Sequence, residues 1–159
     1  NPIAIKIGKN TDFAKLRQIV SILNPENDRG KIILTSRFGV GNSAKFLAPI
    51  IEDMKSSRLN VIWCCDPMHG NTKKLENGLK TRNFCDILAE FREFSEVCGS
   101  ANVYVGGIHI EATAEDVTEC CDEEISLGDL NKNFKSLCDP RLNYRQSLEL
   151  INKIKFVLS

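Results

Sequence analysis

The fold is decided by the stretch Asn60-Val-Ile-Trp-Cys-Cys-Asp-Pro-Met-His-Gly-Asn-Thr72. Its apolar start predicts a short strand, which must stop at Asp66-Pro67 because proline cannot donate to a sheet ladder. His69 follows at once, where the strand passes into a loop. A histidine so placed is held by a rigid strand and faces open space, as a metal ligand or an acid–base group must be. A loop histidine without a chemical role fits equally well, so this stretch leaves both interpretations open.

The composition is that of a globular, soluble protein with enough apolar residues for one sizeable core. The chain has 159 residues, 42% hydrophobic, and its 21 basic and 21 acidic side chains cancel. This neutrality argues against nucleic acid and membrane surfaces as partners, because both require a basic patch. No apolar run approaches the roughly 18 residues of a membrane span, and the first residues do not begin a signal peptide.

The cysteine pattern indicates neither a disulfide framework nor Cys-x-x-Cys metal spacing. An odd number of cysteines in a chain of this length fits a reducing compartment, in which most thiols pack as small hydrophobic groups. The seven are Cys64, Cys65, Cys85, Cys98, Cys120, Cys121 and Cys138. The sequence also lacks an initiator methionine and opens inside a strand pattern, so we expect an upstream part of the polypeptide.

Four strand patterns alternate with four amphipathic helix patterns. We expect strands at 3–7, 31–37, near 61–63 and at 103–111, with a plain polar loop at 72–80. Such alternation predicts a parallel sheet with right-handed crossovers. Four units fit an open doubly wound sheet or half of an eight-unit barrel, because a full barrel typically needs about 250 residues.

Three finer expectations concern the helices. Pro49 falls inside the second helix pattern and should bend that helix or shift its start. Ser126 and Asp129 form a capping box, which predicts a short helix that runs through Leu137. The apolar stripe of the last helix is expected at Leu148, Ile151, Ile154 and Leu158.

Charged residues at or near the carboxyl ends of the strands favour the barrel, because barrels and open α/β sheets build their active sites at that edge. Lys6 lies on a strand face otherwise stripped of bulk and needs an anionic partner, which is either a bound anion or an internal carboxylate. Arg37 ends an apolar strand; it suits a planar grip on phosphate or carboxylate, or an ordinary surface position.

A nitrogen-and-oxygen set of metal ligands is available in His69, Glu111 and Asp139, matching a divalent ion such as manganese, cobalt or zinc. The three are far apart in sequence, so no local spacing establishes the set. His109 is interpreted as a core or supporting histidine. The acidic run at 115–124 is interpreted as a solvated loop face. Dinucleotide binding and serine-hydrolase chemistry are disfavoured, because no Gly-x-Gly-x-x-Gly loop and no Gly-x-Ser-x-Gly elbow is present.

With these residues assembled, the chain resembles the class II (plant and microbial) 3-deoxy-D-arabino-heptulosonate 7-phosphate (DAHP) synthases. The combination of DPMHGNT with CDPRLN is highly specific, and the matching blocks follow family order across the whole chain. The blocks are NPIAIKIG (1–8), LTSRFG (34–39), WCCDPMHGNT (63–72), KTRNF (80–84), GGIHIE (106–111), VTEC (117–120) and CDPRLN…QSLEL (138–150).

The resemblance implies a (β/α)8 barrel of which residues 1–159 supply the last four units, as a single partial domain without its N-terminal half. It implies condensation of phosphoenolpyruvate with D-erythrose 4-phosphate to DAHP and phosphate, the first step of the shikimate pathway to aromatic amino acids. It also implies a divalent metal, commonly manganese or cobalt, on His69, Glu111 and Asp139. Lys6 and Arg37 are then expected to bind phosphoenolpyruvate, while the general acid and base stay unassigned.

The family resemblance further implies a homo-oligomer when complete, in the cytoplasm or, in a plant, the plastid. In the family, a cysteine metal ligand comes from the first half of the barrel, and no cysteine here lies in that context. The leading hypothesis is therefore an enzyme portion that works only with its other half. Two alternatives are a non-catalytic half-barrel that retains phosphate or metal ligands, and a thiol-based zinc or redox protein.

Overall fold

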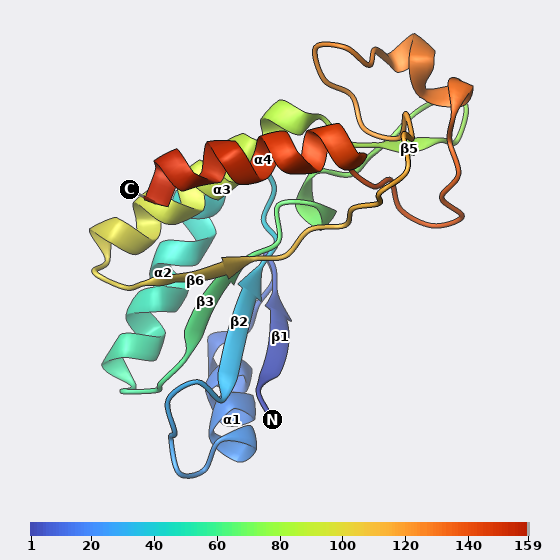
Figure 1. Ribbon diagram of the computed structural model, residues 1–159. Coiled ribbons are helices and arrows are strands. Elements are labelled where there is room, and N and C mark those ends of the chain that lie inside the picture. Colours follow the sequence, from blue (N-terminus) through green and yellow to red (C-terminus); the bar gives the residue numbers. More distant parts are fainter. Residues whose placement is uncertain (159) are drawn as a thin grey trace.

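The computed structural model describes residues 1–158, apart from the side chains of Phe156 and Leu158. Its four main strands form one parallel sheet, in which each strand lies beside the next one along the chain (Figure 1). The strands are β1 (Ile3–Ile7), β2 (Ile32–Ser36), β3 (Ile62–Cys65) and β6 (Val105–Ile108). The helices that alternate with them are α1 (Phe13–Leu23), α2 (Ser43–Ser56), α3 (Phe84–Ser100) and α4 (Tyr144–Leu158).

The predicted alternation of strands and helices is confirmed, and the strand order distinguishes between the two folds left open by the sequence. The order β1-β2-β3-β6 has no reversal, and α1 contacts α2, α2 contacts α3, and α3 contacts α4. A doubly wound sheet reverses its strand order part-way, whereas a barrel adds each unit in the same direction. The chain is therefore an α/β structure with the arrangement of a partial (β/α)8 barrel.

The two faces of the sheet differ in what they carry. The face turned toward the helices contributes five buried residues to the hydrophobic core, namely Ile7, Ile32, Leu34, Trp63 and Cys65. On the opposite face, the strand register aligns Lys6, Thr35, Cys64 and Gly107 in one row. All of these except Thr35 are at least partly accessible. This second face is thus lined by small and polar side chains, with Lys6 at one end of the row.

Two local predictions about strands need correction. The fourth strand ends at Ile108 rather than at residue 111, because its partner β3 ends at Cys65 and the following Asp66-Pro67 cannot extend the ladder. The backbone N–H of His109 makes one more bond, to the Cys65 carbonyl at 2.7 Å. The stretch predicted as a plain polar loop contains a small antiparallel hairpin of β4 (Lys73–Lys74) and β5 (Lys80–Thr81).

The segment between β6 and α4 projects past the end of the sheet (Figure 1). The predicted capping box of Ser126 and Asp129 is present, but it opens a 3-10 helix, η2 (Leu127–Lys132), that does not reach Leu137. This helix ends because Asn133 turns to other partners: its side chain donates to a backbone carbonyl of residue 116, and its backbone N–H to Thr118.

The helix predictions are correct in position and partly wrong in detail. Helix α2 runs through Pro49 from Ser43, so the proline does not shift its start. On α4, Ile154 is buried as predicted, but Leu148 and Ile151 are exposed, and the Leu158 side chain lies outside the described residues. The face of α4 that packs inward instead carries Gln146, Leu150 and Ile154. Within residues 1–158, no helix combines the length and apolarity that crossing a membrane requires.

The loops after β2 and β3 meet backbone to backbone at two glycines. A Cβ on Gly70 would lie 2.3 Å from the nitrogen and 2.9 Å from the Cα of Gly39. A Cβ on Gly39, which has φ +80°, would lie 2.6 Å from the Gly70 carbonyl oxygen. No side chain fits between them, so these glycines set how closely the loop after Arg37 approaches the turn that begins at His69.

We expect Gly70→Ala to destabilise the fold by about 1–3 kcal/mol or more, because the new methyl group can be accommodated only by moving the backbone of Gly39. Gly99→Ala is the matched control, since Gly99 lies in α3 with open space around its Cα. Alanine there should leave stability unchanged or raise it slightly through its helix propensity. Urea unfolding measures both, and equal stabilities of the two variants would contradict the glycine contact.

Candidate functional site

A network of charged side chains lies where the parallel strands end and in the loops that follow them. Its centre is Asp66, directly after β3, whose side chain is fully buried. Its Oδ2 accepts hydrogen bonds from Lys6 Nζ and from His69 Nδ1, the latter at 2.7 Å. Its Oδ1 accepts the backbone N–H groups of Met68 and His69 at 3.1 and 3.2 Å. One carboxylate therefore joins the end of β1 to the turn after β3.

The charge state of Asp66 follows from these contacts. Burial raises the pKa of Asp66, but the hydrogen bond from Lys6, the backbone N–H of His69 and the charge of Lys6 together bring this pKa below its usual value. The carboxylate is therefore ionised at neutral pH and can only accept hydrogen bonds. Nδ1 of His69 therefore faces a hydrogen-bond acceptor, and Nε2 is turned away from Asp66.

The structure brings His69, Glu111 and Asp139 together. Nε2 of His69 lies 3.4 Å from Oε1 of Glu111, and one ligating atom from each of the three residues lies within 4.8 Å of the others. His69 stands on the 3-10 turn η1 (His69–Asn71), whereas Glu111 and Asp139 come from the segment after β6. One imidazole and two carboxylates suit manganese, cobalt or zinc, so the donor set fits the divalent ion expected from the sequence.

A second group, made by Asp66, His69 and His109, satisfies the same geometric criterion. The ring centroids of His69 and His109 are 6.2 Å apart. This group is the weaker candidate, because both oxygens of Asp66 are already occupied by hydrogen bonds. Neither group found among residues 1–158 contains a cysteine, and all seven thiols are unpaired, which removes support from a thiol-based metal site.

Each of the two carboxylates beside His69 forms an ion pair with a basic side chain. Oε2 of Glu111 accepts from Arg82 Nη1 at 2.5 Å, and Oδ1 of Asp139 accepts from Lys80 Nζ at 2.8 Å. The hydrogen bond from Lys80 lowers the pKa of Asp139. Arg82 is completely buried, and its Nη2 has no hydrogen-bond partner among the described residues. Each carboxylate thus pairs with a basic side chain through one oxygen, and the lowered pKa of Asp139 favours its ionised form, which a metal ligand requires.

Lys6 and Arg37 occupy adjacent strand ends but differ in their contacts. Lys6, with a side chain 37% exposed, pairs with an internal carboxylate, which is one of the two partners expected from the sequence. In the strand register Ile7 is opposite Ser36, so Arg37 comes directly after that pair. Its exposed side chain lines an open pocket with residues 8–11. Among the described residues, Arg37 makes no ion pair with the other four predicted site residues.

Glu90 was not predicted from the sequence; it is a fully buried residue of α3 whose hydrogen bonds join two of the site's loops. Its Oε1 accepts the backbone N–H groups of Phe38 and Gly39, both at 2.9 Å, and its Oε2 accepts from Asn71 Nδ2 at 2.7 Å. Burial raises the pKa of Glu90 to about 7 in spite of these hydrogen bonds. The available signal was its position, since Glu90 falls among the apolar residues 87, 91 and 94 of the helix's buried face.

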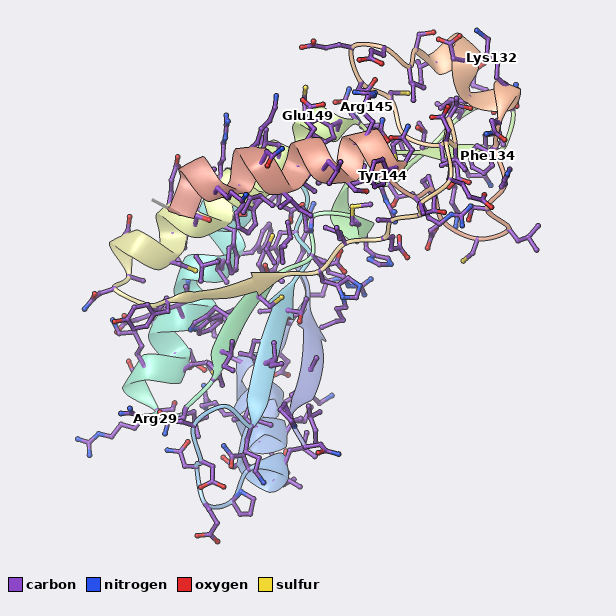
Figure 2. The ribbon with its side chains drawn as sticks, in the orientation of Figure 1. Arg29, Lys132, Phe134, Tyr144, Arg145 and Glu149 are labelled. Carbon is purple, nitrogen blue, oxygen red and sulfur yellow. The ribbon has the colours of Figure 1, made fainter. Side chains whose placement is uncertain are left out.

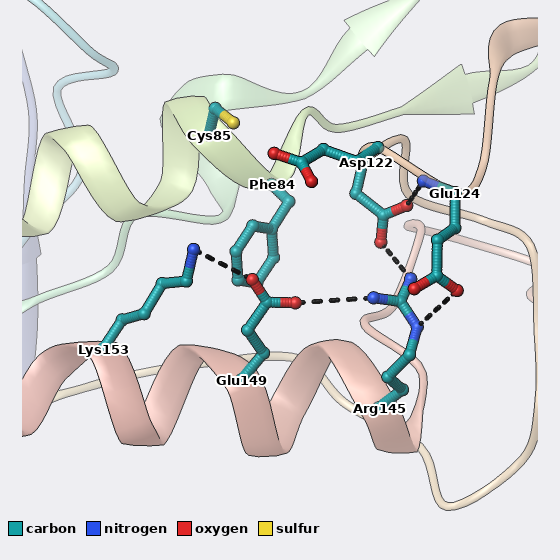
Figure 3. A pocket seen from close by; sticks show the side chains of 8 residues that line it. Phe84, Cys85, Asp122, Glu124, Arg145, Glu149 and Lys153 are labelled. Carbon is teal, nitrogen blue, oxygen red and sulfur yellow. Dashed lines mark hydrogen bonds and ion pairs between the residues drawn. The ribbon is translucent and has the colours of Figure 1, made fainter.

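The interpretation of the acidic run as a solvated face is wrong for two of its residues. Glu119 is completely buried and accepts hydrogen bonds from the backbone N–H groups of residues 135, 136 and 141 and from the Arg141 side chain. It thereby shapes the loop that carries Asp139. Asp122 is almost fully buried and pairs with Arg145, within the cluster shown in Figure 3. These acids are buried because each meets an arginine that sequence spacing does not reveal.

A family model and three similar proteins all point to one family. A family model described as the Class-II DAHP synthetase family matches residues 1–155. The chain is 42% identical over 154 residues to phospho-2-dehydro-3-deoxyheptonate aldolase of Neurospora crassa. It is 43% identical over 152 residues to phospho-2-dehydro-3-deoxyheptonate aldolase AroG of Mycolicibacterium smegmatis. It is 41% identical over 152 residues to phospho-2-dehydro-3-deoxyheptonate aldolase of Streptomyces coelicolor. Each match covers 94% of this chain and 32–34% of the relative, so the chain spans about a third of their length.

The raised pKa of Glu90 predicts a specific pH dependence of stability. Between its ordinary value of 4.5 and about 7, the folded chain holds a proton that the unfolded chain has lost, so stability falls as pH rises. We expect the wild type to lose up to about 3 kcal/mol across this range relative to Glu90→Gln. The exposed control Glu96→Gln should follow the wild type. Chemical unfolding at a series of pH values provides the test, and parallel curves for wild type and Glu90→Gln would contradict it.

Proposed function

The chain belongs to the class-II DAHP synthetase family, and on this premise we propose that it carries metal-binding and substrate-binding residues of a DAHP synthase. Such an enzyme condenses phosphoenolpyruvate with D-erythrose 4-phosphate to DAHP and phosphate, the first step of the shikimate pathway. The observation that carries the proposal is the convergence of His69, Glu111 and Asp139 within 4.8 Å, next to the Lys6–Asp66 pair. The direct test is DAHP formation by the complete protein, which a non-catalytic half-barrel would not support.

We assign the metal to His69 Nε2, Glu111 and Asp139, with manganese or cobalt as the expected ion and zinc as an alternative. When bound, a divalent ion supplies Lewis-acid activation of the aldehyde oxygen of erythrose 4-phosphate. The chain's own residues prepare the site: Asp66 orients His69, while Lys80 and Arg82 pair with one oxygen each of Asp139 and Glu111. The general acid and base remain unassigned.

We assign the binding of phosphoenolpyruvate to Lys6 and Arg37. The substrate carries a phosphate and a carboxylate, and a guanidinium can grip either with two parallel hydrogen bonds. The adjacent strand positions, the accessible part of Lys6 and the open pocket beside Arg37 support this assignment. Holding the anion beside the metal would place its reacting carbon for attack, a positioning effect that can contribute several kcal/mol.

We infer that residues 1–159 form a single partial domain whose partner is the N-terminal half of the same barrel. Within residues 1–158, each outer strand has a neighbour on one side only, since β1 pairs with β2 and β6 with β3. Unpaired strand edges and exposed apolar side chains suit further strand–helix units. The exposed apolar residues near these edges are Ile3, Ile19, Ile22 and Leu23 on one flank and Tyr144, Leu148 and Ile151 of α4 on the other. Family membership alone suggests a homo-oligomer in the cytoplasm or a plastid.

Manganese titration of the complete protein tests the metal assignment. His69→Ala, Glu111→Gln and Asp139→Asn should each weaken binding by more than the roughly 10–100-fold that loss of a supporting residue costs, and each should abolish DAHP formation. His109→Gln is the matched control, because His109 belongs only to the alternative group, and it should bind manganese as the wild type does. Calorimetry gives the affinities. Equal binding by wild type and His69→Ala would show that the assignment is wrong.

Arg37→Met should weaken phosphoenolpyruvate binding about 10–100-fold, because a charge-assisted hydrogen bond contributes about 1.5–3 kcal/mol. The control is Arg29→Met, which removes the same charge from the loop before β2, at the opposite end of that strand (Figure 2). Binding is measured by titration of the metal-free complete protein. If both variants bind phosphoenolpyruvate like the wild type, Arg37 does not contact this substrate.

A further inference from the structure

We propose that Asp66 is a positioning residue that sets the tautomer of His69 and restrains Lys6 through the same oxygen atom. This inference rests on the proposed function, because it takes His69 as a metal ligand and Lys6 as an anion-binding group. It goes beyond that function by assigning a role to a side chain that touches neither ligand. The role is to keep Nε2 of His69 unprotonated for the metal and to hold Lys6 in an ion pair until an anion binds.

The contacts of Asp66 leave it no other role. Its side chain is fully buried, so it does not reach solvent or a ligand. Both oxygens are occupied: Oδ1 by the backbone N–H groups of Met68 and His69, and Oδ2 by Lys6 Nζ and His69 Nδ1. The two backbone bonds fix the plane of the carboxylate and aim Oδ2 between the two side chains. Asp66 thus acts on the chemistry only through Lys6 and His69.

The tautomer of His69 follows from the acceptor-only character of a carboxylate. Because Oδ2 cannot donate, the neutral imidazole must place its proton on Nδ1, which leaves the lone pair of Nε2 directed at Glu111, 3.4 Å away. An amide at position 66 would reverse this arrangement. Its oxygen would keep the two backbone N–H bonds, and its NH₂ would donate to Nδ1, so that the proton would move to Nε2 and block the lone pair a metal requires.

For Lys6, the same substitution should favour ligand binding rather than weaken it. In the wild type, an incoming anion competes with Asp66 Oδ2 for the ammonium group. An amide nitrogen at this place cannot accept from Lys6, so the lysine would be released toward the anion. Loss of the Asp66 carboxylate should therefore weaken metal binding without weakening anion binding, a combination that simple disruption of the site would not produce.

The experiment compares Asp66→Asn with wild type in the complete protein. Imidazole ¹⁵N chemical shifts report the His69 tautomer without metal or substrate, and His69→Gln assigns the signals. Manganese affinity and metal-free phosphoenolpyruvate affinity are measured by titration. Asp122→Asn is the matched control, since it also converts a buried carboxylate to an amide, but one that pairs with Arg145 (Figure 3) and contacts neither Lys6 nor His69 among the described residues.

We expect Asp66→Asn to carry the proton on Nε2, to bind manganese about 10–100-fold more weakly, and to bind phosphoenolpyruvate at least as tightly as wild type. Asp122→Asn should change none of the three. The inference is overturned if the variant keeps the Nδ1 proton, binds manganese normally, or loses both affinities together.

Two further outcomes remain decisive. If Asp66→Asn does not fold, the wild-type spectrum still decides, because a neutral His69 with its proton on Nε2 would overturn the inference. If wild type binds neither manganese nor phosphoenolpyruvate, the proposed function fails, whereas the tautomer measurement, which needs neither ligand, still tests the role of Asp66.

Discussion

A buried carboxylate that is shared between Lys6 and His69 is the interaction on which the rest of the site depends. Burying an ionised group is costly unless it is paired and hydrogen-bonded, and Asp66 meets both conditions with four donors. Its place in the chain follows from the strand that precedes it, because Pro67 ends the ladder immediately after the acid. The stop in β3 and the placement of Lys6 and His69 are therefore one local feature.

Two other buried acids hold the surrounding loops, and their different environments show what decides the charge state. Glu119 meets Arg141 and three backbone N–H groups, which outweigh burial and lower its pKa. The donors that Glu90 meets among the described residues are all neutral, and burial raises its pKa to about 7. Asp66 resembles Glu119, because Lys6 supplies the charge. A cation within reach thus separates the acids that stay ionised from the one that titrates near neutrality.

Most of the fold could be predicted from the sequence, since strand and helix periodicities are local. The rotation of α4 could not, because its buried face carries Gln146, whose amide donates to the Cys120 carbonyl and to Asp122. The five predicted site residues could be named from strand ends and from motifs. Their geometry could not, because the long segment after β6 returns Asp139 to Glu111 by a path that no periodicity encodes. Asp66 was recognised only as part of a strand stop, and Glu90 was hidden within an apolar helix face.

The family assignment and the geometry together support the proposal that an imidazole and two carboxylates from separate parts of the chain bind a single ion. The most direct measurement is a crystal structure of the complete protein soaked with manganese, with anomalous scattering recorded to locate the ion. The account predicts one anomalous peak within bonding distance of His69 Nε2, Glu111 and Asp139, with Asp66 still bound to His69 Nδ1. A peak bonded to Asp66 and His109, or the absence of a peak at His69 Nε2, would contradict it.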